Sequence, residues 1–252
     1  MIFYFSGTGN SRYAAEQMAK STNEKLVYMS KQTMNETTSY QLEEDERVGF
    51  VFPIYWYGVP KIVEQFIDQL KFSNYKGQYV YVVVTYGGSC GNTMRQIATI
   101  LEKQGLPLAA KFGVKMVDNY VLMYDLPSKE KQQKTIAEAK QQIAAIAAEV
   151  AKKSIKESYH KGAIAPFSPL LQRIYKRVDH SKKFYATDAC INCGLCEKNC
   201  PSNVITVLEN GPEWNGDCIG CLKCLHTCPK QAIQYGKGTE KRGRYTFPGI
   251  VE

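Results

Sequence analysis

Eight of the nine cysteines in this 252-residue chain belong to two copies of one short pattern. Each copy reads Cys-x2-Cys-x2-Cys-x3-Cys-Pro, first over residues 190–201 and again over residues 218–229. Three thiolates with this spacing can surround three corners of an iron–sulfur cube from one short loop, and the run is an established bacterial signature of such sites. The doubled pattern therefore indicates two 4Fe–4S clusters.

In sites with this signature, the fourth cysteine of each run binds the cluster of the other run. The first cluster would then be bound by Cys190, Cys193, Cys196 and Cys228. The second would be bound by Cys218, Cys221, Cys224 and Cys200. Pro201 and Pro229 would turn the chain away from the fourth ligand, because proline cannot continue a helix.

Zinc and disulfide bonds are the alternatives for so many cysteines. Zinc sites usually take two cysteines from each Cys-x2-Cys limb, whereas each run here supplies three before its final Cys-Pro. Disulfide bonds need an oxidising compartment, and residues 1–5 contain no basic leader. A cluster that cleaves S-adenosylmethionine would need the different spacing Cys-x3-Cys-x2-Cys. We therefore expect a metal-binding, iron–sulfur protein in a reducing cytoplasm.

A polar, glycine-rich loop lies near the N-terminus, between a predicted strand over residues 1–5 and a predicted helix over residues 12–20. It reads Ser6-Gly7-Thr8-Gly9-Asn10-Ser11. Backbone N–H groups and the helix dipole make such a loop suitable for a phosphate. The loop lacks the lysine of the triphosphate motif and the third glycine of the dinucleotide motif, so it favours a phosphomonoester. A plain glycine-rich turn is the alternative.

Predicted strands and helices alternate along the first part of the chain. The further strands lie over residues 26–29, 48–52, 79–85 and 112–117. The further helices lie over residues 61–70, 92–104 and 128–156, and residues 31–46 are predicted to form an exposed loop. The almost wholly apolar strand over 79–85 is typical of the centre of a parallel sheet covered on both faces. The pattern predicts an α/β fold with an open, doubly wound, five-stranded parallel sheet.

Two further loops follow strands at the edge where such a sheet binds ligands. They read Pro53-Ile54-Tyr55-Trp56-Tyr57-Gly58 and Tyr86-Gly87-Gly88-Ser89-Cys90-Gly91-Asn92. The consecutive aromatic residues could cover a flat heteroaromatic ring, and a glycine beside them allows a peptide to change orientation when a ring nitrogen gains a proton. An aromatic patch for a protein partner is the alternative. Together with the phosphate loop, these loops favour a flavin mononucleotide (FMN) site.

These motifs carry a resemblance that extends over nearly the whole chain. Residues 1–155 resemble a flavodoxin, and residues 188–236 resemble a bacterial two-cluster ferredoxin. The combination, with Met116-Val117-Asp118-Asn119-Tyr120 after the fifth strand, is similar to the flavodoxin–ferredoxin fusions of anaerobic bacteria called EFR1-family ferredoxins. The resemblance implies a non-covalently bound FMN and electron transfer among three centres. Tyr120 would lie in a third loop near the ring and either stack or pack there.

The chain is basic, with a formal net charge of +8. Such an excess can attract nucleic acid, steer an acidic redox partner or be a solvated surface. Because part of it lies beside the cysteine runs, we expect a redox protein as donor or acceptor, for which an acidic ferredoxin is a candidate, and no nucleic acid. No apolar stretch approaches the ~20 residues of a membrane span.

We divide the chain into four segments. They are a flavodoxin-like FMN-binding domain (1–157), a basic linker (158–187), a small α+β ferredoxin domain of the two-cluster 4Fe–4S type (188–236) and a C-terminal tail (237–252). Cys90 is expected to be a small apolar filler or a thiol beside the flavin. His226 is expected to lie on the surface, because eight cysteines already satisfy two clusters.

The expected function is electron transfer between the two clusters and bound FMN, linking a low-potential ferredoxin-type donor to a partner reductase. The alternative is an FMN-dependent reductase that acts directly on a small organic substrate with electrons fed through the clusters. A redox sensor that binds DNA through its basic surface is a third interpretation. No acid–base pair is evident beside the aromatic loop, so no catalytic residue is predicted.

Overall fold

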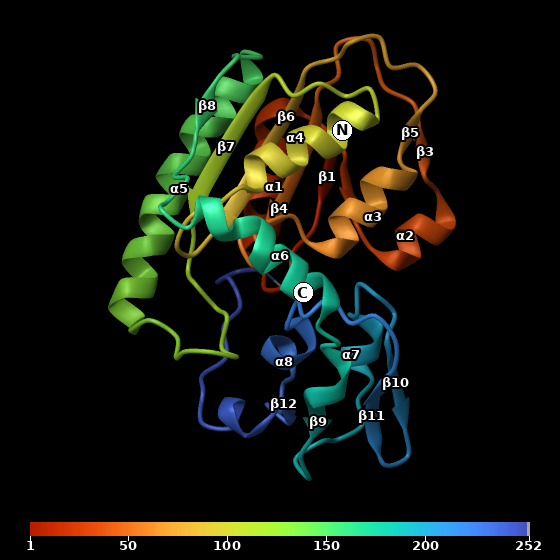
Figure 1. Cartoon of the computed structure of the whole chain (residues 1–252), viewed down its shortest axis with the longest axis vertical. Coiled ribbons are helices and arrows are strands. Elements are labelled where there is room, and N and C mark those ends of the chain that lie inside the picture. The colour runs from red at the N-terminus through yellow and green to blue at the C-terminus, as the bar shows by residue number, and fades with distance from the viewer. Residues whose placement is uncertain (251–252) are drawn as a thin grey trace.

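The computed structural model describes residues 1–250 and has two parts, a larger N-terminal one and a smaller C-terminal one (Figure 1). The N-terminal part is built on a parallel sheet, in which the described residues form six strands in the order β2-β1-β4-β6-β7-β8. These strands are β1 (Ile2–Tyr4), β2 (Leu26–Tyr28), β4 (Val48–Pro53), β6 (Val80–Tyr86), β7 (Ala110–Lys115) and β8 (Glu157–Ser158). The doubly wound α/β architecture expected from the sequence is confirmed.

Helices cover both faces of this sheet. They are α1 (Asn10–Thr22), α3 (Lys61–Gln69), α4 (Thr93–Lys103) and α5 (Lys129–Ala151). α1 and α5 bury one face with Met18 and Ile143, while α3 and α4 bury the other with Phe66 and Ile97. β6 lies between β4 and β7 and is buried along almost its whole length, as expected for a central strand covered on both sides.

Two features differ from the expectation. The sheet gains a sixth strand, β8, which pairs with β7 and is held there by an ion pair of 2.7 Å between Lys111 Nζ and Glu157 Oε1. Residues 31–46 are not simply an exposed loop, because they contain α2 (Lys31–Glu36) and β3 (Ser39–Tyr40), which pairs with β5 (Lys71–Phe72). Both strands are two residues long, which is too short to show a sequence period.

The C-terminal part is small and mixes short helices with antiparallel strand pairs. Its strands are β9 (Phe184–Ala186), paired with β12 (Ile233–Tyr235), and β10 (Ile205–Leu208), paired with β11 (Gly211–Trp214). Its helices are α7 (Leu195–Lys198) and α8 (Lys223–Thr227), with the short 3-10 turns η2 (Ser181–Lys183) and η3 (Lys237–Thr239). Both cysteine runs lie in this part, each on a loop that leads into α7 or α8.

The connector between the two parts contains η1 (Ala165–Phe167) and the helix α6 (Ser168–Arg177), which crosses their junction (Figure 1). The Tyr175 hydroxyl on α6 donates a hydrogen bond of 3.0 Å to the Ile219 carbonyl in the second cysteine run. Lys61, at the start of α3, forms an ion pair of 2.6 Å with Asp217. These contacts hold the cysteine loops against the carboxyl edge of the sheet.

Within residues 1–250, none of the helices combines the length and the apolar character needed to cross a membrane.

Candidate cofactor sites

The polar loop near the N-terminus lies between β1 and the first turn of α1. Gly9 has a φ of 92°, a left-handed conformation that a residue with a side chain adopts only under strain. Its N–H donates to Ser6 Oγ at 3.0 Å, so the loop folds back on itself. The N-cap residue, Gly9, has no side chain to cap α1, which leaves N–H groups of the first turn for an anion.

Side chains of this loop join two neighbouring segments. Ser11 Oγ lies 2.7 Å from Thr85 Oγ1 at the end of β6. Asn119 Nδ2, in the loop after β7, donates to Thr8 Oγ1 at 2.7 Å. The carboxyl ends of β1, β6 and β7 are therefore tied together around one space.

That space is a cavity of about 380 Å³, within the range typical of cofactor sites. The predicted residues that line it are Ser6, Gly7, Thr8, Asn10, Ser11, Pro53, Ile54, Tyr55, Trp56, Tyr57, Tyr86, Gly87, Gly88, Ser89 and Tyr120. The predicted residues outside its lining are Gly9, Gly58, Cys90, Gly91 and Asn92. Cys90 is fully buried in the core, and Gly91 and Asn92 lie against Ser168 of α6.

Aromatic side chains make one wall of the cavity. Trp56 and Tyr57 have φ of 48° and 60°, and the turn that contains them is closed by paired hydrogen bonds between Tyr55 and Gly58. Such conformations cost about 1–3 kcal/mol each and persist only where the surroundings impose them. Here Gln172 of α6 donates to the Tyr55 and Trp56 carbonyls.

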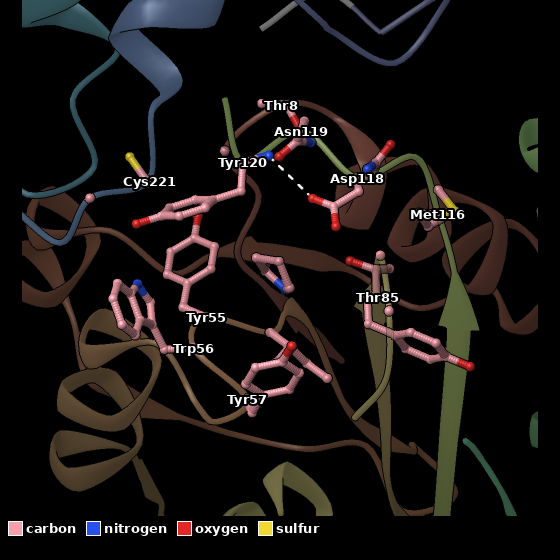
Figure 2. A pocket seen from close by; sticks show the side chains of 18 of the residues that line it. Thr8, Tyr55, Trp56, Tyr57, Thr85, Met116, Asp118, Asn119, Tyr120 and Cys221 are labelled. Carbon is pink, nitrogen blue, oxygen red and sulfur yellow. Dashed lines mark hydrogen bonds between the residues drawn. The ribbon is translucent and has the colours of Figure 1, made fainter. Parts of the chain in front are cut away.

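Across the cavity from this turn lies the loop that follows β7 (Figure 2). Tyr120 meets the Trp56 ring edge to face at 6.3 Å between centroids. Asp118 accepts hydrogen bonds from the Tyr120 N–H and, at 2.8 Å, from the Tyr124 hydroxyl. Aromatic rings therefore border an open space rather than filling it.

The residues present fit an FMN. Hydroxyl groups and a helix N-terminus suit its phosphate, and the aromatic turn suits its ring. A Cβ on Gly87 would lie 2.6 Å from the Cβ of Asp118, so glycine lets the second ring loop approach the loop after β7 this closely. His180 is 2% exposed and lines the cavity, yet neither of its ring nitrogens has a partner among the described residues. A polar ligand in the cavity would satisfy such a group.

Burial lowers the pKa of His180, with further lowering from nearby Lys61. The imidazole is therefore neutral near pH 7 and offers one donor and one acceptor. No local sequence pattern predicts that His180 belongs to the site. It reaches the cavity only because the connector packs against the second cysteine run.

The predicted cluster ligands surround two small cavities in the C-terminal part. One is lined by Cys190, Cys193, Cys196, Cys224 and Cys228. The other is lined by Cys200, Cys218, Cys221 and Cys224. Each predicted set of four thiols thus borders one space, and Cys224 borders both. Within residues 1–250, no group of three or more His, Cys, Asp or Glu side chains is arranged to hold a single metal ion.

The two sets, named here the outer set (Cys190, Cys193, Cys196 and Cys228) and the inner set (Cys200, Cys218, Cys221 and Cys224), differ in burial. Cys193 is exposed, whereas Cys218 and Cys224 are buried. Burial raises the pKa of the Cys218 thiol to about 11 and also raises the pKa of Cys221 and Cys224. Burial therefore favours the neutral thiols, and a bound iron cluster would supply the positive charge that stabilises the thiolates.

The inner set also borders the large cavity, since Cys221 lines it (Figure 2). A Cβ on Gly7, in the phosphate loop, would lie 2.6 Å from the Cys221 carbonyl oxygen. The backbone of the cysteine loop thus touches the backbone of the phosphate loop. Nothing in either motif predicts this contact.

His226 corrects the expectation of a surface residue. It is buried, and burial lowers its pKa to about 4. Its Nδ1 accepts from the Tyr245 N–H at 3.2 Å, so its Nε2–H donates to the Asn119 carbonyl at 3.0 Å. This residue of α8 thereby connects the loop after β7 to the C-terminal tail.

The described part of the tail also reaches the phosphate loop. The Phe247 N–H donates to the Thr8 carbonyl at 2.8 Å, and the Phe247 ring stacks on Tyr13 with 4.4 Å between centroids. The Tyr245 hydroxyl donates to Asn10 Oδ1 at 2.8 Å. The tail therefore covers the outer side of the loop that would hold the phosphate.

Two family models match the chain. Residues 9–147 match a flavodoxin-like fold, and residues 188–240 match a 4Fe-4S dicluster domain. Since the first match covers more than half of the chain, the chain belongs to the family with the flavodoxin-like fold. The predicted fold class is thereby confirmed, including a C-terminal 4Fe–4S ferredoxin domain.

Two curated relatives match short stretches of the chain. A ferredoxin-like protein in the nif region of Trichormus variabilis is 39% identical over 46 residues, which are 18% of this chain and 40% of the relative. Pyruvate synthase subunit PorD of Thermotoga maritima is 37% identical over 71 residues, which are 27% of this chain and 65% of the relative. The chain thus spans less than two thirds of these relatives. They support an electron-transfer role and binding of iron–sulfur clusters.

Two solved structures show a weak similarity to the chain. A flavodoxin of Streptococcus pneumonia TIGR4 is 14% identical with a TM-score of 0.34, covering 57% of this chain and 97% of that chain. Rubredoxin oxygen:oxidoreductase of Desulfovibrio gigas is 20% identical with a TM-score of 0.32, covering 60% of this chain and 36% of that chain.

Proposed function

We propose that this protein holds one FMN and two 4Fe–4S clusters and relays electrons between them, linking a low-potential ferredoxin-type donor to a partner reductase. The resemblance to EFR1-family flavodoxin–ferredoxin fusions of anaerobic bacteria is part of this proposal. So is the division into an FMN-binding domain (1–157), a basic linker (158–187), a ferredoxin domain (188–236) and a tail (237–252).

One observation carries the proposal: the inner set and the candidate flavin cavity share a wall. Cys221 belongs to the predicted ligands of one cluster and lines the cavity at the same time. The close approach of Gly7 to the Cys221 carbonyl excludes any side chain between the two loops. A cofactor in the cavity and a cluster on the inner set would therefore be neighbours.

Contacts between the two parts keep this arrangement fixed. The ion pair between Lys61 and Asp217, the hydrogen bond from Tyr175 to Ile219 and the bridge made by His226 all cross the junction. Centres held in one chain at a fixed separation need no diffusive encounter for each transfer. That is the advantage a relay gains from the fusion of two domains.

The residues have separate tasks in this proposal. FMN supplies a centre that accepts one or two electrons. The loop over residues 6–11 binds its phosphate, and Trp56, Tyr57 and Tyr120 border its ring and exclude water. The outer set, with Cys193 exposed, offers one place where electrons can enter from, or leave to, another protein. A reducing cytoplasm remains the expected location, because thiolate-bound clusters need one.

An FMN-dependent reductase that acts on a small organic substrate remains the second candidate. The observation that favours it is His180, a buried imidazole that lines the cavity and has no hydrogen-bond partner within residues 1–250. It is a proton donor of the kind that was not evident from the sequence. In a reductase, a His180→Phe variant would lose turnover of substrate but keep both cofactors, whereas a pure carrier would keep its electron exchange.

Composition and photoreduction test the proposal. Anaerobically purified protein should contain about eight irons and one FMN per chain, as the ligand count requires. On stepwise photoreduction, electrons should redistribute between the flavin and the clusters. The flavin absorbance and the cluster absorbance should therefore change together. Clusters that are reduced without ever exchanging electrons with the flavin would refute the relay.

A further inference from the structure

We propose that the mouth of the flavin cavity is a docking surface for an acidic redox protein, formed by the exposed face of α6 together with Met123 and Tyr124. This inference rests on the proposed function and deepens it, because it names the partner's chemistry and the place of contact. The surface lies at the cavity and is separate from the outer set of cysteines.

An apolar stripe runs along the exposed side of α6. Phe167 and Leu170 are 62% and 59% exposed, and Ile174 is 42% exposed. Phe167 directly precedes α6, and the spacing of three and four residues places all three side chains on one side of the helix. Leu171, on the adjoining edge of that face, lines the cavity. The stripe therefore begins at the cavity and extends outward over the helix.

Exposed apolar side chains also lie on the other side of the opening. Met123 is 67% exposed, Tyr124 is exposed as well, and both line the cavity. Their loop follows β7, so it is far from α6 in the sequence. Two distant segments thus present large apolar side chains around one opening, which is typical of an interaction site rather than of scattered surface residues.

Positive charge flanks the stripe. α6 carries Arg173, Lys176 and Arg177 and has no acidic residue. Lys176 is paired with Glu64 at 2.5 Å, whereas Arg173 and Arg177 are exposed and form no ion pair within residues 1–250. An apolar centre with a charged rim is the usual anatomy of a protein interface. The two free guanidinium groups complement a partner with an acidic rim, which they would also steer during approach.

Other occupants fit this surface less well. A second copy of the chain docked on the same face would oppose Arg173 and Arg177 with the same charges, because a two-fold contact pairs a patch with itself. Binding to a lipid surface would require α6 to bury its apolar face among the headgroups. α6 has ten residues and is held in place by Gln172 and Tyr175, which bind the walls of the cavity.

Charge reversal on the full chain, purified anaerobically with its cofactors, tests the proposal. The probe is an acidic bacterial two-cluster ferredoxin, and the measured quantity is the rate constant of electron exchange at low and high salt. Arg173→Glu with Arg177→Glu should lower the low-salt rate constant about tenfold or more and flatten its salt dependence. Leu170→Ser with Ile174→Ser should weaken binding of the ferredoxin by a similar factor.

Matched controls lie at the opposite edge of the sheet. Lys76, before β6, and Lys103, at the end of α4, are exposed cations without an ion pair among the described residues. Ile155, before β8, is an exposed apolar residue. Lys76→Glu with Lys103→Glu, and Ile155→Ser, should change the exchange rate constant less than twofold. Absorbance of flavin and clusters checks that every variant is loaded.

Hydrogen exchange locates the contact independently of electron transfer. Ferredoxin should protect residues 167–177 and 121–124, and protection confined to residues 190–198 around the outer set would overturn the proposal. Equal effects of the test and control variants would also overturn it. The proposal would also be overturned if the α6 variants lost self-association, or binding to phosphatidylglycerol vesicles, while their electron exchange with ferredoxin stayed unchanged. If electrons do not pass between the flavin and the clusters of one chain, the proposed function is refuted instead. The pattern of hydrogen-exchange protection then still decides where the ferredoxin docks.

Discussion

Adding one methyl group at Gly7 tests whether the flavin cavity and the inner set are in direct contact. The Cβ of alanine would lie 2.6 Å from the Cys221 carbonyl oxygen and 3.2 Å from the Tyr55 hydroxyl. An unstrained carbon–oxygen contact is about 3.4 Å. The Tyr55 side chain can yield, but one of the two backbones must retreat by about 0.8 Å.

The magnitude follows from the cost of overpacking, which is about 1–3 kcal/mol. If this free energy is lost from folding, the melting temperature of Gly7→Ala should fall by roughly 2–12 °C. If the phosphate loop yields instead, FMN binding should weaken by about 5- to 150-fold. Either way, the two backbones move apart, and transfer between flavin and clusters should slow.

Three assays measure these effects: thermal unfolding, fluorescence titration of the apoprotein with FMN, and anaerobic photoreduction. Gly238→Ala is the matched control, because a Cβ there would meet its nearest neighbour, Arg242 Nη1, at an ordinary 3.8 Å. The reasoning is refuted if Gly7→Ala matches the natural chain in stability, FMN affinity and internal transfer, since the two loops would then not be in contact.

Three further predictions concern the outer set, His226 and the tail. Cys193→Ala should lower the iron content from about eight to about four per chain while FMN is retained, and loss of all iron, or of FMN, would contradict the separate cluster sites. His226→Phe leaves the Asn119 carbonyl and the Tyr245 N–H without their hydrogen-bond partner. The free energy of unfolding should therefore fall by about 1–3 kcal/mol for each buried group. An unchanged denaturation midpoint would contradict this and would show that water replaces the imidazole. Tyr245→Phe removes the hydrogen bond to Asn10 Oδ1, which contributes about 0.5–1.5 kcal/mol. FMN should therefore dissociate a few times faster, as measured by stopped flow. An unchanged dissociation rate would mean that the tail does not support the phosphate loop.

Local chemistry made much of the site predictable. Each cysteine run needs only its own spacing to identify it, and the phosphate loop is recognised by its place between a strand and a helix. β6 was predicted to within one residue at each end. α5 was predicted to within one residue at its start, but it ends at Ala151 and not at residue 156. The aromatic loop that contains Trp56 could be assigned to the site because it follows a buried strand.

Contacts between segments far apart in the sequence were not predictable in this way. His180 reaches the cavity because α6 packs on the second cysteine run, and His226 is buried because the tail returns over α8. Neither residue has a neighbour in the sequence that sets its environment. The same is true of β8, a strand of two residues whose pairing with β7 depends on the whole preceding fold.

Diffraction from an anaerobically grown crystal, with data collected at the iron absorption edge, tests the central claim most directly. The account predicts two iron peaks, one on each cysteine set, and an FMN whose ring lies between Trp56 and the loop after β7, with the inner peak next to that ring across the Cys221 loop. A cavity without flavin, or a single iron peak remote from the cavity, would contradict it.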